Sequence, residues 1–156
     1  ALDNRRRRDL LLFGVVQAWD ADTARESART LARRQFDGFA IGGMVPRARD
    51  LALVRAMVEA VRGEIGDRPL HVFGLGKPDV VRQLFEWGVD SVDSSSYVKL
   101  AANGKVWGDD QFHLPDATVP ERLNLALCNL ATAAGRSLPL AASRLVFRSS
   151  ALGLAG

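Results

Sequence analysis

Hydrophobic residues along the first two thirds of the chain follow two alternating patterns. Segments predicted to be strands fall at residues 10–17, 36–43, 70–76 and 89–94, and the first of them is a continuous apolar run typical of a buried parallel strand. Between two of these segments, apolar side chains recur every three or four residues from Leu51 to Ile65, as on one face of a helix. Strands that alternate regularly with helices favour a parallel sheet with right-handed crossovers.

Local signals mark the ends of the helices. Thr23, followed by Glu26, resembles a capping box at the start of a helix that extends to about residue 35. Pro78 suits the first turn of a third helix, and Gly88 suits the position just after its end. These signals divide residues 10–98 into four strands and three intervening helices.

The pattern changes after residue 98. Residues 99–120 are polar and contain the turn signal Asn103-Gly104. Helices are predicted from Pro120 to Leu130 and over residues 138–147. The fold class is therefore α/β, with a partial TIM (β/α)₈ barrel of about four βα units in residues 1–100. A loop and helical extension follow in residues 101–156.

Composition narrows the class of protein. No apolar run approaches the roughly 20 residues that span a bilayer, so no membrane partner is expected and a cytoplasmic location fits. The single cysteine excludes an intramolecular disulfide. The net charge of +3 comes mostly from arginine, which permits a nucleic-acid partner, although a high-GC coding bias explains it equally well. The run Arg5 to Arg8 is interpreted as a solvated helix face, with phosphate contact as the alternative.

Four motifs at the strand ends, taken in order, resemble the tRNA-guanine transglycosylase superfamily, whose members exchange guanine for a 7-deazaguanine. The resemblance covers about residues 10–98. Of its branches, Asp-Ser-Ser-Ser-Tyr (93–97) is most similar to the archaeosine-type and DNA 7-deazaguanine transglycosylases. The four motifs are Gly-Val-Val-Gln (14–17), Phe-Ala-Ile-Gly-Gly (39–43), Gly-Leu-Gly-Lys-Pro (74–78) and Gly-Val-Asp-Ser-Val-Asp (88–93).

The resemblance implies that Asp93 is the nucleophile. A carboxylate can attack C1′ of ribose, form a glycosyl ester and release it again. Read from the residues alone, Asp93 is better interpreted as a cap of the turn after its strand, helped by Ser94 and Ser95, and the ordered set of motifs reverses that preference. Asp90, near the start of the same strand, is interpreted as a loop or cap residue.

The same resemblance implies a base-binding set at the ends of the other strands. Gln17 can offer a donor and an acceptor to a purine edge, or it can bond neighbouring backbone. Gly42 and Gly43 let a flat base approach the backbone, or simply form a tight turn. Met44 and Phe73 are candidate apolar walls for the base, and either can instead belong to the core.

Three further residues are assigned by their place in the predicted fold. Lys99 and Lys105 flank the loop on the side of the site, where they are predicted to meet the phosphate backbone beside an extruded nucleotide. His71 opens a predicted strand at the end far from the chemistry, and it is interpreted as structural.

The resemblance also implies parts that the sequence does not contain. Family members are full barrels with a second catalytic Asp and a further base-binding Asp in the first half, whereas these residues supply the last four strands. His113 and Cys128 cannot provide the four ligands of the family's zinc site, so no metal or cofactor is expected. Sheet edges at residues 10–17 and near Val92 would lack partners, which predicts self-association, pairing with a separate N-terminal half, or origin from a longer protein.

The predicted function is base exchange in nucleic acid, either tRNA or DNA, through an Asp–ribose intermediate, with a 7-deazaguanine as incoming base. Two alternatives remain. Residues 74–77 can cradle an anion before a helix, which fits a barrel enzyme acting on a small phosphorylated metabolite. The chain can also be a non-catalytic subunit that only binds nucleic acid.

Overall fold

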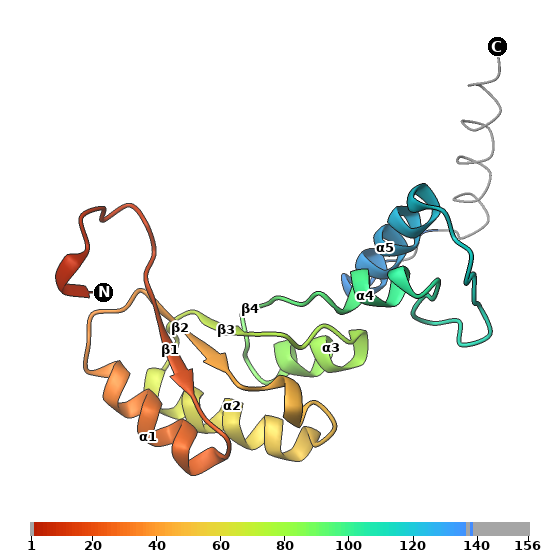
Figure 1. Ribbon diagram of the computed structural model, residues 1–156. Coiled ribbons are helices and arrows are strands. Elements are labelled where there is room, and N and C mark those ends of the chain that lie inside the picture. Colours follow the sequence, from red (N-terminus) through yellow and green to blue (C-terminus); the bar gives the residue numbers. More distant parts are fainter. Residues whose placement is uncertain (1, 137, 139–156) are drawn as a thin grey trace. The chain divides into compact units, whose positions relative to one another are not determined.

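The computed structural model describes residues 2–136 and 138 in two compact units (Figure 1). The first unit comprises residues 1–75 and 79–94, and the second comprises residues 76–78 and 95–156. Each unit is considered by itself below. None of the helices in the described residues is long and apolar enough to cross a membrane.

The first unit is built on a four-stranded parallel sheet, which confirms the predicted α/β class and the parallel arrangement of its strands. The strands follow one another across the sheet in chain order. Their register places Gln17 beside Gly42, and His71 between Ala40 and Ser91. The strands are β1 (Phe13–Gln17), β2 (Gly38–Gly42), β3 (Leu70–Val72) and β4 (Ser91–Val92).

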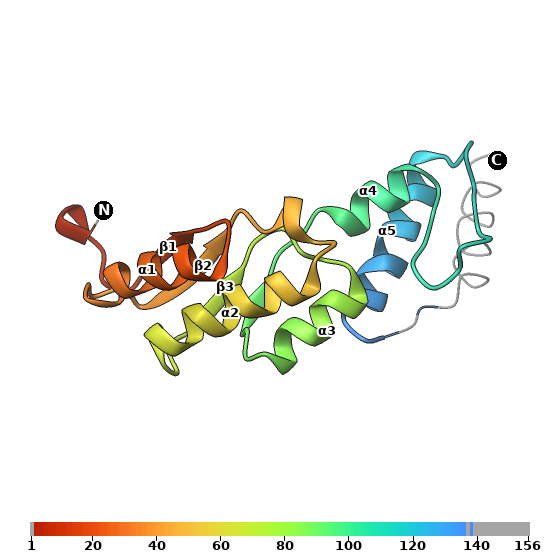
Figure 2. The same ribbon diagram turned by 90° about the horizontal axis from the view of Figure 1, so that it is seen from below.

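Three helices cover one face of this sheet (Figures 1 and 2). They are α1 (Ala21–Ala32), α2 (Leu51–Ile65) and α3 (Pro78–Glu86). Alternate strand residues point toward them and are completely buried, as the period of two requires. Removing this apolar surface from water is the main source of the unit's stability. The buried strand residues are Val16, Phe39, Ile41, Leu70 and Val72, and the helices contribute Val54, Val58, Val61 and Leu84 among others.

The intervening strand positions form the opposite face of the sheet, which we call the open face. It carries Val15 and Gln17 on β1, His71 on β3 and Ser91 on β4. Val15 is 43% exposed although it lies in the centre of its strand. The two faces of the sheet therefore differ sharply, because the described residues bury one of them under helices and leave much of the other exposed.

The N-terminal segment differs from its prediction. The first strand begins at Phe13, and Leu10 and Leu11 are 56% and 72% exposed rather than buried. The arginine run is not a helix face: a short 3₁₀ turn ends at Asn4, and an irregular segment follows. The Arg5 guanidinium donates to the carbonyls of Arg7, Arg8 and Leu10, which holds the segment in a turn.

The capping box of α1 also lies three residues earlier than predicted. Asp20 is the N-cap, and its carboxylate accepts a hydrogen bond from the Thr23 backbone N–H at 2.8 Å. Thr23 returns the interaction by accepting from the Asp20 N–H at 3.2 Å. A Thr at the third helical position thus takes the role usually filled by Glu or Gln.

The second unit contains α4 (Ser96–Ala102) and α5 (Val119–Ala133), packed on each other through a small apolar cluster. The buried Asn129 fastens the loop between the helices, accepting from Trp107 N–H at 2.8 Å and donating to the carbonyls of Tyr97 and Lys105. Two predictions are confirmed here. Gly104 turns the chain with φ of 68° after α4, and Cys128 is buried on α5. The helix predicted over residues 138–147 lies, apart from Leu138, outside the described residues.

Candidate active site

Asp93 follows β4 directly, at the carboxyl end of the parallel sheet. Its Oδ1 accepts a hydrogen bond from the backbone N–H of Gly74 at 2.9 Å, and its own carbonyl accepts from the same N–H at 3.0 Å. The side chain is nevertheless 62% exposed. The carboxylate is therefore fixed by the neighbouring strand and still accessible to a substrate.

Gly74 is required by this arrangement. Its φ of 81° is a conformation that residues with a side chain rarely adopt, and an added Cβ would lie 2.4 Å from Cγ2 of Val45. The chain can turn here and direct the N–H at Asp93 only with glycine. This N–H is already engaged by Asp93, so it does not form part of an open anion cradle of the kind predicted for residues 74–77.

Gln17, the last residue of β1, lies beside Gly42, the last residue of β2, and Gly43 follows Gly42 in the chain. Gln17 pairs with Gly42 across β1 and β2, and an added Cβ at Gly42 would lie 2.7 Å from the Gln17 Nε2. The amide group of Gln17 therefore occupies the space above Gly42. Gly43 turns the chain with φ of 73°, and Arg47 fixes this turn by donating to the carbonyls of Gly43 and Trp19 at 2.6 and 2.9 Å. The result is a polar, flat patch at the end of two adjacent strands.

The two candidate apolar walls have different environments. Phe73 is 40% exposed at the end of β3, and its ring meets the His71 ring edge-on at a centroid distance of 4.7 Å. Met44 is completely buried within the hydrophobic core. Phe73 has surface to offer a ligand, whereas Met44 has none in this arrangement and is left out of the proposed site.

His71 lies beside Asp93, which the sequence analysis did not foresee. Its Nδ1 is 2.9 Å from Ser91 Oγ, and its Nε2 is 3.6 Å from Asp93 Oδ1. The prediction placed it at the far end of a longer strand, but β3 has three residues and His71 is the middle one. The alternation of His71 and Phe73 with buried Leu70 and Val72 was the available signal, because it assigns both rings to one face.

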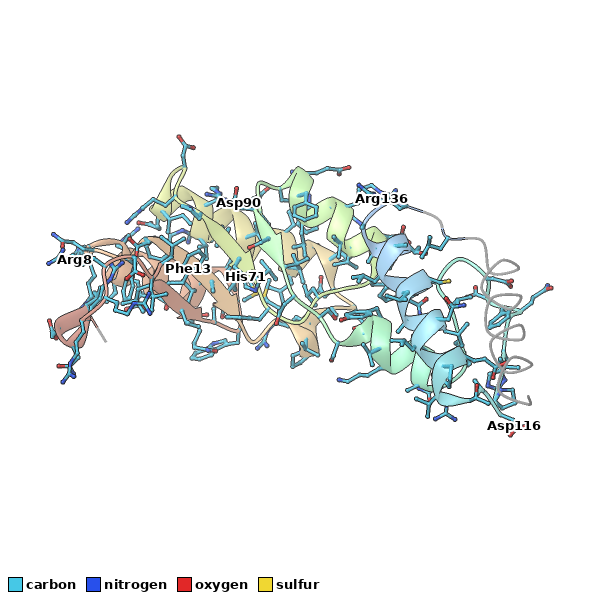
Figure 3. All side chains as sticks on the ribbon, turned by 90° about the horizontal axis from the view of Figure 1, so that it is seen from above. Arg8, Phe13, His71, Asp90, Asp116 and Arg136 are labelled. Atoms are coloured by element: carbon cyan, nitrogen blue, oxygen red, sulfur yellow. The ribbon has the colours of Figure 1, made fainter. Side chains whose placement is uncertain are left out.

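Two other aspartates lie at the amino end of the sheet and have structural roles. Asp90 accepts from the Leu70 N–H at 2.8 Å and pairs with Arg62 at 3.0 Å, as its interpretation as a cap suggested (Figure 3). Asp37 accepts from the Leu12 N–H at 2.7 Å and pairs with Arg5 at 3.0 Å. In each case the hydrogen bond from the backbone N–H holds the carboxyl pKa below its ordinary value, and the arginine lowers this pKa further by a smaller amount.

The remaining predicted residues belong to the second unit or to no cluster. Lys99 lies in α4 and Lys105 in the loop after it, and both are exposed. Their contact with a phosphate backbone stays a prediction. Among residues 2–136 and 138, no three His, Cys, Asp or Glu side chains gather as a metal site.

A hollow of about 440 Å³ lies where β1 meets α1. Gln17 and Val15 contribute to it from the strand, and Trp19 and Leu31 contribute from the segments around α1. Asp93 is not part of its lining. The hollow follows the outer edge of β1, where no strand of the described residues pairs.

Comparison with known proteins adds an independent observation. A family model described as "Queuine tRNA-ribosyltransferase" matches residues 1–132. A queuine tRNA-ribosyltransferase from Thermotoga maritima is 38% identical over 95 residues, which are 60% of this chain and 26% of that protein. A tRNA-guanine(15) transglycosylase from Methanosphaera stadtmanae is 34% identical over 117 residues, covering 72% of this chain and 16% of that protein. The chain thus spans about a quarter or less of the length of these relatives.

Proposed function

This chain belongs to the queuine tRNA-ribosyltransferase family, and we propose on that premise that it provides the nucleophile for replacing guanine in nucleic acid. The observation that carries the proposal is Asp93, an accessible carboxylate held by the Gly74 N–H at the carboxyl end of a parallel sheet. Active sites of parallel barrels are built at this end of the strands. The substrate is a guanine nucleotide of tRNA or DNA, and the incoming base is a 7-deazaguanine.

In the proposed reaction, the Asp93 carboxylate attacks C1′ of the ribose. The C1′–N9 bond breaks, its electron pair leaves with guanine, and guanine gains a proton. The incoming 7-deazaguanine then loses its N9 proton and displaces the carboxylate from C1′. The resemblance implies a second catalytic Asp, from the other half of a barrel, as the group available for these proton transfers. Because the base must be reached from outside its stack, the nucleotide has to be extruded.

The patch formed by Gln17, Gly42 and Gly43 is the proposed site for the base. The Gln17 amide can donate to and accept from a purine edge. Gly43 is exposed and leaves its backbone accessible to a flat ring, whereas Gly42 is buried beneath the Gln17 amide and makes room for it. Phe73 offers an exposed aromatic surface at the end of β3. This strand lies between β2, where the patch ends, and β4, which leads to Asp93. Lys99 and Lys105 are proposed to contact the phosphate backbone of the same nucleic acid.

We further propose that the sheet is part of a (β/α)₈ barrel. The three helices cover one face of the sheet, as the helices on the outside of such a barrel do, so the open face is the side that would line its interior. The outer edge of β1 is available for pairing with another strand, supplied by a second copy or by a separate N-terminal half. Such pairing would also cover Val15.

The experiment is covalent trapping of guanine-containing tRNA or DNA on the chain, followed by denaturing electrophoresis. Wild type is expected to form an adduct, and Asp93→Asn is expected to form none. Asp22→Asn is the matched control, because this carboxylate is 92% exposed on α1 and forms an exposed ion pair with Arg25, and it should retain the adduct. An adduct that persists in Asp93→Asn, or none in any variant, would contradict the proposal.

A further inference from the structure

His71, which is labelled in Figure 3, makes three contacts on the open face of the sheet. Its Nδ1 lies 2.9 Å from Ser91 Oγ, its Nε2 lies 3.6 Å from Asp93 Oδ1, and its ring packs edge-on against Phe73. The side chain is only 18% exposed, whereas that of Asp93 is 62% exposed. The imidazole is thus a partly enclosed group next to an accessible carboxylate.

The register of the sheet explains why these groups meet. His71 pairs with Ser91 across β3 and β4, so the two side chains point to the same face. Asp93 is two residues beyond Ser91 and therefore belongs to that face as well. The Phe73 ring, with an interplanar angle of 71°, restricts rotation of the imidazole from the side of its own strand. The ring nitrogens are in this way aimed at Ser91 in β4 and at Asp93 directly after it.

We propose that His71 is a positioning residue for Asp93, oriented by Ser91 and donating from Nε2 to Oδ1. This role rests on the proposed function of Asp93. This role requires the Ser91 hydroxyl to donate to Nδ1, so that the imidazole carries a proton on Nε2, the nitrogen facing the carboxylate. A contraction of the 3.6 Å separation by several tenths of an ångström, as the site closes on substrate, completes the hydrogen bond.

The same contacts distinguish the two oxygens of Asp93. Within the described part of the chain, the Gly74 N–H and His71 both address Oδ1. Oδ1 is thus held from two sides, and Oδ2 is the oxygen presented for attack on C1′. His71 acts by fixing the rotation of the carboxylate, which affects the rate of attack rather than the binding of nucleic acid.

Two amide substitutions separate this role from a structural one. His71→Gln can place a side-chain N–H near the position of Nε2, whereas His71→Asn reaches only the position of Nδ1. We expect His71→Asn to lower the rate of adduct formation at saturating nucleic acid by about tenfold or more, with the half-saturating concentration unchanged. His71→Gln should restore the rate to within about threefold of wild type. Thermal unfolding of both variants measures any loss of fold.

A second readout does not depend on turnover. Long-range ¹⁵N–¹H spectra of the imidazole should show a protonated Nε2 and an unprotonated Nδ1 in wild type, and Ser91→Ala should weaken this preference. A protonated Nδ1 with a bare Nε2 in neutral His71 would overturn the proposal. Equal rates for His71→Asn and His71→Gln would also overturn it, while leaving the nucleophilic role of Asp93 intact. Wild type that forms no adduct would instead remove the proposed function, and the role of His71 with it.

Discussion

The two ends of the parallel sheet hold their aspartates in different ways. At the amino end, Asp37 and Asp90 each accept a backbone N–H from the neighbouring strand and each pair with an arginine. At the carboxyl end, Asp93 also accepts a backbone N–H, but it faces the His71 ring in place of an arginine. A hydrogen bond from a backbone N–H to an aspartate carboxylate can thus hold two strands together at one end of the sheet and hold the proposed nucleophile in place at the other. In each aspartate the second partner contacts the same oxygen as the backbone N–H, and the identity of this partner, arginine or histidine, distinguishes the two uses.

The amino-end aspartates are therefore expected to affect stability, and the carboxyl-end residues to affect chemistry. Gly74 is the exception that belongs to both groups, because its N–H orients Asp93 and its backbone conformation is needed for the turn. Substitutions at the two ends should separate folding from adduct formation.

The largest effect is expected for Gly74→Ala. A φ of 81° and a Cβ placed 2.4 Å from Val45 Cγ2 should together cost about 2–4 kcal/mol of unfolding free energy. Adduct formation should fall as well, because the N–H that holds Asp93 is displaced. Urea denaturation measures the first effect. Gly63→Ala is the control, since nothing lies within 4 Å of its Cβ on α2, and it should be neutral or slightly stabilising.

A smaller effect, on the binding of the incoming base and not on stability, is expected at Gln17. Gln17→Ala should raise the half-saturating concentration of the incoming base by about tenfold, which corresponds to one lost hydrogen-bonding group. Gly42→Ala should reproduce this change, because its Cβ would displace the Gln17 amide. Stability should remain as in wild type for Gln17→Ala. An unchanged base dependence in both variants would remove Gln17 and Gly42 from the proposed site.

The opposite end of the sheet should respond in stability alone. Asp90→Ala leaves the N–H of the buried Leu70 without its acceptor and should cost about 1 kcal/mol. Glu59→Ala, which removes an exposed pair with Arg55 on α2, should change stability by less than about 0.5 kcal/mol. The adduct rate per folded molecule should equal that of wild type in both variants. A lower rate in Asp90→Ala would mean that the two ends of the sheet are not separate.

The smallest effect is a pH dependence of stability at the amino end. Asp37 and Asp90 have folded pKa values below their ordinary value near 3.9, so the unfolded chain binds protons first as the pH falls. Their contribution is fully present above about pH 4 and is lost as the pH falls through the folded pKa values. The double variant Asp37→Asn/Asp90→Asn should therefore lose less stability than wild type between pH 5 and the acid limit. Equal acid dependence of the two proteins would contradict this assignment.

The sequence predicted the elements better than it predicted their contacts. Apolar runs and caps located four strands and three helices in the right order, because burial imposes those periods directly. The run beginning at Leu10 was misleading, because its apolar residues start before Phe13, the first residue that pairs with β2. His71 was assigned to the wrong end of the sheet because strand length is set by pairing with neighbours, which composition does not report. The meeting of His71, Ser91 and Asp93 depends on register across two strands.

The most direct test of the account is to identify the residue that carries the trapped nucleotide. Tryptic digestion of the adduct should yield the peptide of residues 83–99, which contains Glu86, Asp90 and Asp93. Fragmentation is expected to assign the added mass, that of the nucleotide without guanine, to Asp93. The same mass on Asp90, on Glu86 or on a peptide elsewhere in the chain would contradict the central claim.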